Sequence, residues 1–145
     1  MITEFRNVYG SAEDPVATWP YEGMVEVLER GGAHSWRPIL TEIRREPWGP
    51  VARRLEKYLS YAEEQALVNL FSLAISTYRA AAESQEKELV AKRVRTAIEE
   101  SGLSAHEFAS LIGTSPSRLS TYATGKVVPS AAMLMRMEQY AAQDA

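Results

Sequence analysis

The chain has 145 residues, of which 46% are hydrophobic and 24% charged, a composition typical of a folded protein with one or two small domains. It contains no cysteine, which excludes disulfide bonds, a thiol nucleophile and cysteine-based zinc sites. The formal net charge of −3 is unusual for a nucleic-acid-binding protein, although residues 84–145 are formally neutral and the excess negative charge precedes them.

The first ten residues contain no apolar run. The longest apolar segment, around residues 66–75, is interrupted by Asn69 and Ser72. Neither a signal peptide nor a membrane span is expected, and we expect a cytoplasmic protein.

Residues 1–17 lack hydrophobic periodicity and are expected to form a loop or an extended arm. Apolar residues then recur at helical spacing in three short stretches, each bounded by glycine or proline. The expected helices contain Met24 to Leu28 before Gly31 and Gly32, Trp36 to Ile43 before Pro47, and Pro50 to Leu59.

Residues 61–101 contain neither glycine nor proline. We expect a helix over most of residues 61–82, with the polar stretch at 82–88 either a connector or a continuation into the next helix. An apolar stripe on this helix is expected to form a dimer surface, unless the shorter helices cover it and any dimer contact comes from residues 133–140. The stripe consists of Leu67, Leu70, Phe71, Ala74, Ile75 and Tyr78. No strand-like alternation is found, so the predicted fold class is all-α.

Residues 90–140 predict four further short helices. The first carries Val90, Val94 and Ile98 on one face and ends at Gly102. Ser104 and Glu107 have capping-box spacing for the next helix, residues 105–112. Its expected buried face is Phe108, Leu111 and Ile112.

Gly113 permits a sharp turn, and Ser115 with Pro116 is a favoured helix start. The third helix should run to Thr124 and end at Gly125. Leu119, Tyr122 and Ala123 should point inward, and Ser117, Arg118, Ser120 and Thr121 outward. Pro129 and Ser130 predict the start of a fourth helix, whose apolar side should carry Met133, Leu134, Met137 and Tyr140.

The segment from Leu103 to Ser130 resembles the lambda-repressor-like (Cro/XRE) helix-turn-helix family. The resemblance rests on Ala109, Gly113 and Leu119 at offsets of four and ten, and on the later Gly125-Lys126 and Pro129-Ser130. It implies that the helix 116–124 enters the major groove of double-stranded DNA.

The same resemblance implies two sets of contact residues. Arg118 is the strongest base reader because its guanidinium can donate two hydrogen bonds to guanine. The base-reading set is Pro116, Ser117, Arg118 and Thr121, and the phosphate-binding set is Ser104, Ala105, Ser115, Thr124, Lys126 and Arg93. The chain departs from the family at Ile98 and Ala123, where many members have a buried arginine and glutamate.

No constellation typical of catalysis is found. His106-Glu107 lacks the second histidine of a zinc-protease helix, because position 110 is Ser110. His34 lies in a predicted turn, and no catalytic triad or phosphate-binding glycine pattern is present. We therefore expect no enzyme activity, metal or cofactor. Arg44, Arg45, Arg53, Arg54 and Lys57, near Trp36 and Trp48, form either a charged helix face or a second nucleic-acid contact.

The sequence thus predicts an N-terminal helical domain, residues 1–83, for dimerisation or for binding a partner or signal. It predicts a helix-turn-helix DNA-binding domain in residues 84–145. The expected function is sequence-specific transcriptional regulation, of the repressor type, by a homodimer. Two alternatives remain open: an antitoxin that autoregulates its operon, and a protein-interaction module that has lost DNA binding. The operator, the regulated genes, the direction of regulation and any effector are not indicated.

Overall fold

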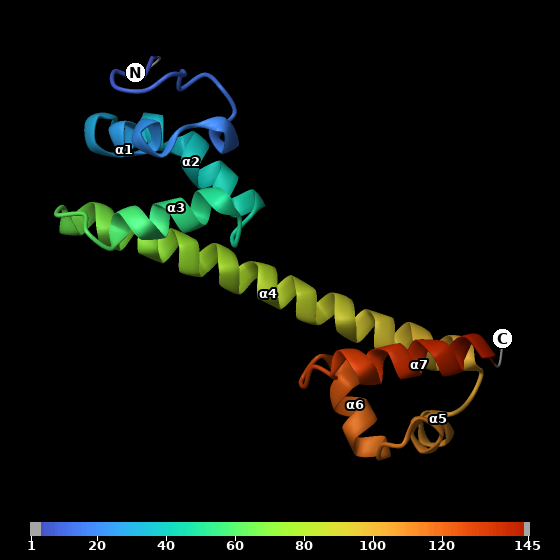
Figure 1. The fold of residues 1–145 in the computed structure, drawn as a ribbon. Coiled ribbons are helices and arrows are strands. Elements are labelled where there is room, and N and C mark those ends of the chain that lie inside the picture. The colour runs from blue at the N-terminus through green and yellow to red at the C-terminus, as the bar shows by residue number, and fades with distance from the viewer. Residues whose placement is uncertain (1–3, 144–145) are drawn as a thin grey trace. The chain divides into compact units, whose positions relative to one another are not determined.

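The computed structural model describes residues 4–143, and their contacts group the chain into two compact units, residues 1–82 and 83–145. Within residues 4–143 there are seven α-helices, one short 3-10 helix and no β-strand (Figure 1). The predicted all-α fold class is confirmed.

The first unit contains three short helices and the start of a long one. They are preceded by the 3-10 helix η1 (Val16–Thr18), and the expected positions of the three short helices are confirmed. Their bounds are α1 (Tyr21–Arg30), α2 (Ala33–Arg45) and α3 (Pro50–Leu59), and the long helix is α4 (Gln65–Ser101).

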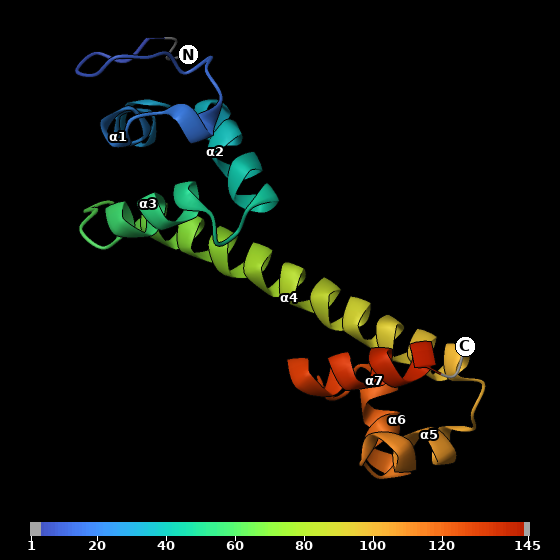
Figure 2. The same cartoon turned by 45° about the vertical axis from the view of Figure 1, so that its right-hand side comes forward.

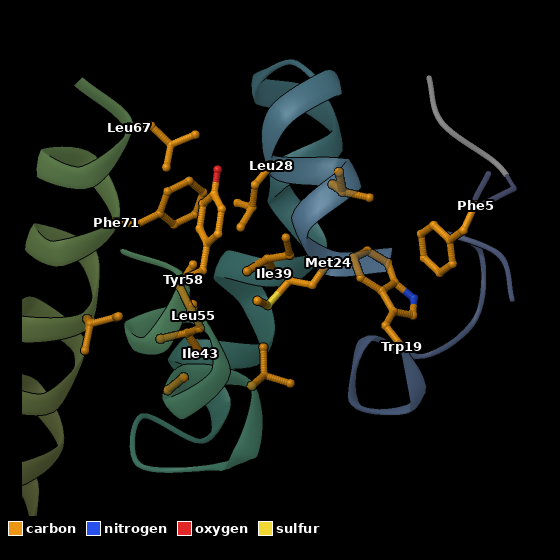
Figure 3. Packing of buried hydrophobic residues seen from close by; sticks show 14 residues of the cluster. Phe5, Trp19, Met24, Leu28, Ile39, Ile43, Leu55, Tyr58, Leu67 and Phe71 are labelled. Atoms are coloured by element: carbon orange, nitrogen blue, oxygen red, sulfur yellow. The ribbon is translucent and has the colours of Figure 1, made fainter. Parts of the chain in front are cut away.

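The core of the first unit receives side chains from every one of these α-helices, as Figure 3 shows. Met24 and Leu28 of α1, Ile39 and Ile43 of α2, Leu55 and Tyr58 of α3, and Leu67 and Phe71 of α4 belong to this core. Leu67, Phe71 and Ile75 are almost fully buried. The expectation that the apolar stripe forms a dimer surface is therefore wrong for these three residues, because they pack inside their own unit.

Residues 4–15 form no helix, as expected of a loop or an extended arm, and Phe5 in this segment packs on Trp19. The rings of Phe5 and Trp19 meet edge to face, with centroids 5.5 Å apart, and both side chains are buried. A Cβ atom at Gly23 would lie 2.7 Å from the Phe5 ring, so glycine is required there for α1 to approach it.

Helix α4 has 37 residues, and it contributes to both units. The polar stretch after Ala82 is helical. It therefore continues the helix into the second unit and is not a connector between two helices. Figure 2 shows the unbroken ribbon of α4 from a second direction.

The second unit combines the end of α4 with α5 (Ala105–Ile112), α6 (Pro116–Thr124) and α7 (Ala131–Gln143). Its core contains Val94, Phe108, Ile112, Leu119, Tyr122 and Met137. Leu111, which was expected to be buried, is 41% exposed because Phe108, Ala109 and Ile112 form the buried face of α5 and Leu111 lies beside it. Ala123 is only half-buried.

Candidate nucleic-acid interface

A tight turn joins α5 to α6. Gly113 follows α5 with φ of +81°, a left-handed conformation that L side chains adopt only with strain. The N–H of Thr114 donates to the carbonyl of Ala109 at 2.9 Å and closes the helix end. The expected role of Gly113 in a sharp turn is confirmed.

Two serine side chains cap the helices on either side of the turn. Ser104 Oγ accepts a hydrogen bond from the Glu107 N–H at 3.1 Å, and Ser115 Oγ accepts one from the Arg118 N–H at 3.1 Å. In the described chain, the Glu107 carboxylate does not make the return bond of a full capping box. Each serine therefore satisfies one exposed N–H and fixes where its helix begins.

Helix α6 presents one polar face and buries the other. Leu119 and Tyr122 are buried in the core of the second unit, whereas Pro116, Ser117 and Arg118 are exposed. Thr121 is partly exposed, and its hydroxyl donates to the Arg118 carbonyl at 2.6 Å. Since this bond uses the hydroxyl proton, Thr121 is available to an external ligand as an acceptor.

A neighbour on the same helix orients the Arg118 guanidinium. Arg118 Nε donates to the Tyr122 hydroxyl at 2.8 Å, and the guanidinium carbon lies 5.9 Å from the centroid of the Tyr122 ring. Tyr122 itself is only 5% exposed. Among residues 4–143, the two Nη groups of Arg118 have no hydrogen-bond partner, so the fork is held at its base with both tips available.

The residues expected to bind phosphate lie on several elements. Ser104 and Ala105 are exposed at the start of α5, and Ser115 caps α6. Thr124 and Lys126 are exposed on either side of Gly125, whose φ is +80°. The N-terminal N–H groups of both helices lack partners within the helix, which makes these ends suitable for an anion.

Arg93 differs from the rest of this set because its charge is already neutralised by an ion pair. It lies on α4, and its guanidinium makes two hydrogen bonds with the Glu138 carboxylate of α7, of which the Nε–Oε2 bond is 3.0 Å long. A phosphate at Arg93 would have to compete with this carboxylate.

Two further arginines make contacts that were not predicted from the sequence. Arg95 Nη1 donates to the Ala123 carbonyl at the end of α6 (2.7 Å), and Arg136 Nη1 donates to the Ile112 carbonyl at the end of α5 (3.0 Å). Both contacts place a cation at the negative end of a helix. In the sequence, Arg95 and Arg136 are visible only as basic residues near the helix-turn-helix motif. Their positions do not reveal which carbonyl groups they contact.

No site for a metal or for a membrane span is found in the described part of the chain. No group of three or more acidic, histidine or cysteine residues among residues 4–143 could hold a metal ion. Over the same residues, no helix combines the length and the apolar character that a membrane crossing requires. Both histidines, His34 and His106, are exposed.

Two short helices joined by a tight turn, with an oriented arginine on the exposed face of the second, define a helix-turn-helix domain. Residues 89–143 match the family described as "Helix-turn-helix domain", which confirms for this part of the chain the resemblance seen in the sequence. No curated protein and no solved structure matches the chain.

Proposed function

We propose that this protein is a sequence-specific DNA-binding regulator of transcription that acts as a homodimer and represses the genes it binds. The observation that carries the proposal is the exposed face of α6, where Arg118 is oriented by Tyr122 and keeps both Nη groups available. A guanidinium held in this way can donate to O6 and N7 of one guanine in the major groove.

The other exposed residues supplement this contact. Pro116 and Ser117 lie at the start of α6 and Thr121 lies past its middle. All three contact neighbouring bases, with less discrimination than the arginine fork gives. Ser104, Ala105, Ser115, Thr124 and Lys126 hold the phosphates on either side, and Arg93 joins them only by leaving Glu138.

Because residues 84–145 are formally neutral, non-specific attraction to DNA is weak and specificity depends on contacts with the bases. A single α6 covers only a half-site, which favours two copies on a palindromic operator. The exposed apolar residues Leu70 and Leu73 of α4, 45% and 65% exposed, are the dimer contact that we propose for the first unit.

The first unit supplies dimerisation and, beyond it, a surface for a protein partner or a signal. We assign it no catalytic role, and we place the protein in the compartment that contains the DNA, the cytoplasm. The family match supports DNA binding by the second unit only.

Binding-site selection tests the proposal. Full-length protein is incubated with a library of randomised duplexes at low salt, and bound duplexes are sequenced over successive rounds. The proposal predicts an enriched motif of two inverted half-sites. Failure to enrich any sequence would contradict it and favour the module that has lost DNA binding. Enrichment together with an obligate toxin partner in its own operon would instead favour the antitoxin.

A further inference from the structure

A hollow of about 160 Å³ lies in the first unit, between the N-terminal segment and the start of α2. Its apolar walls are Ala12, Trp19 and Pro38. Apolar cavities of about 150 Å³ in proteins accommodate a single benzene ring, so the hollow has the size of one six-membered ring.

The Trp19 wall is held rigidly. The indole Nε1 donates to the Asp14 carbonyl at 2.9 Å, and the ring packs edge to face on Phe5. Arg54 Nη1 donates to the Trp19 carbonyl at 3.1 Å and fixes the backbone at the same residue. A ligand ring would therefore meet a surface that is formed before it binds, which lowers the ordering cost of binding.

The Arg37 side chain supplies a cation to the lining of the hollow. Arg37 of α2 is exposed and makes no hydrogen bond or ion pair with any residue in the range 4–143. The nearby Arg45, by contrast, is paired with Glu42 and Glu46. Arg37 also lines a second, larger hollow of about 490 Å³, which continues along α2 and shares Ala12, Glu13 and Pro38 with the first.

Two further polar side chains stand at the rim. His34 offers a ring nitrogen for a hydrogen bond. Glu13 also lines the hollow, and its carboxylate makes no hydrogen bond or ion pair with any residue in the range 4–143, so it opposes an anionic ligand. The hollow thus has one cationic side chain, Arg37, and one carboxylate, Glu13. This balance favours a ligand that carries one negative charge close to Arg37 over a polyanion such as a nucleoside triphosphate.

We infer that this hollow binds a small aromatic monocarboxylate. The ring fills the hollow lined by Ala12, Trp19 and Pro38, and the carboxylate accepts hydrogen bonds from the Arg37 guanidinium. The inference concerns the first unit alone and does not depend on DNA binding, so its test contains no DNA.

The test is a titration of the isotope-labelled, full-length protein with benzoate, followed by amide chemical shifts. For a ligand of nine heavy atoms we expect a Kd of about 1 mM. The backbone amides of Ala12, His34 and Arg37 should shift, whereas those of α6 should not. Benzamide, which has the same ring without the charge, should bind roughly tenfold more weakly.

Three variants separate the electrostatic contributions. Arg37→Met should weaken benzoate binding roughly tenfold and leave benzamide binding unchanged, because only the charged ligand uses the guanidinium. Glu13→Gln should tighten benzoate binding. Arg53→Met, at an exposed arginine of α3 that lines neither hollow, is the matched control and should have no effect.

Equal binding of benzoate and benzamide would overturn the inference, as would equal losses in Arg37→Met and Arg53→Met. Absence of shifts at these amides up to about fifty times the expected Kd would also overturn it, since a site with that Kd would then be almost saturated. None of these results bears on whether α6 reads DNA.

Discussion

The hydroxyl of Tyr122 holds the base of the Arg118 guanidinium, with 2.8 Å between the hydroxyl oxygen and Nε. Because Tyr122 is buried, the position of the arginine on the exposed side of α6 is linked to the core of the second unit. A side chain oriented in this way loses less conformational freedom when it binds a base.

Tyr122→Phe should therefore weaken specific DNA binding while preserving the fold. The phenylalanine ring fills the same space, and ordering the freed Arg118 side chain on the DNA costs about 0.5–1.5 kcal/mol of binding free energy. Fluorescence anisotropy on a selected operator measures this loss. Tyr140→Phe is the control, because the Tyr140 ring belongs to the same core and its hydroxyl has no partner within residues 4–143. Equal affinities for the two variants would contradict an orienting role.

Variants of the three capping serines should separate effects on folding stability from effects on DNA binding. Ser104, Ser115 and Ser130 each accept a hydrogen bond of 3.1 Å from a backbone N–H at the start of a helix. Replacing any of them by alanine should lower the free energy of unfolding by about 1 kcal/mol, measured by denaturant titration. Only Ser104→Ala and Ser115→Ala should also weaken DNA binding. If Ser130→Ala weakened binding equally, the loss would reflect stability rather than phosphate contact.

The sequence predicted the helices of both units well because glycine, proline and capping residues mark most of their ends. It placed α6 and the turn at Gly113 for the same reason. It could not distinguish Leu67 and Phe71 from Leu70, because all three belong to one apolar stripe and only the packing of α1 to α3 decides which are covered. The carbonyl acceptors of Arg95 and Arg136 are also products of tertiary structure, which no periodicity encodes. The bond from Arg118 to Tyr122, by contrast, joins residues four apart on one helix, a spacing that the sequence does contain.

The two exposed leucines proposed as the dimer contact, Leu70 and Leu73, give a further prediction. Leu73→Lys should weaken dimerisation by at least about 1.5 kcal/mol, because a leucine buried in the interface contributes about that much. Sedimentation equilibrium of the full-length protein measures the change. Leu89→Lys is the matched control, since Leu89 lies on the same helix and is 61% exposed, close to the 65% of Leu73. A monomeric wild-type protein, or equal effects of both variants, would contradict this interface.

Alkaline pH should destabilise the first unit through Tyr58. Burial and the Glu29 carboxylate, to which the Tyr58 hydroxyl donates at 3.2 Å, raise the pKa of Tyr58 from 10.0 to about 12. The folded state therefore holds this proton more tightly than the unfolded state. Its contribution to stability is complete below pH 10 and is lost as pH rises from 10.0 to about 12.

Tyr58→Phe tests the direction of this pH dependence. The variant should be less stable than wild type at pH 8, and the difference in Tm should shrink between pH 10 and 12. A difference that stayed constant or grew over this interval would contradict the assignment.

The most direct test of the central claim is a comparison of Arg118→Ala and Lys126→Ala on the selected operator and on a random duplex of equal length. If Arg118 reads a base, its replacement costs about 1–3 kcal/mol on the operator and relaxes the preference at one base pair, with little loss on random DNA. Lys126→Ala, which removes a phosphate contact, weakens binding to both duplexes by the same factor. If both variants lost affinity equally on operator and random DNA, Arg118 would be a phosphate contact and the account of base reading by α6 would be wrong.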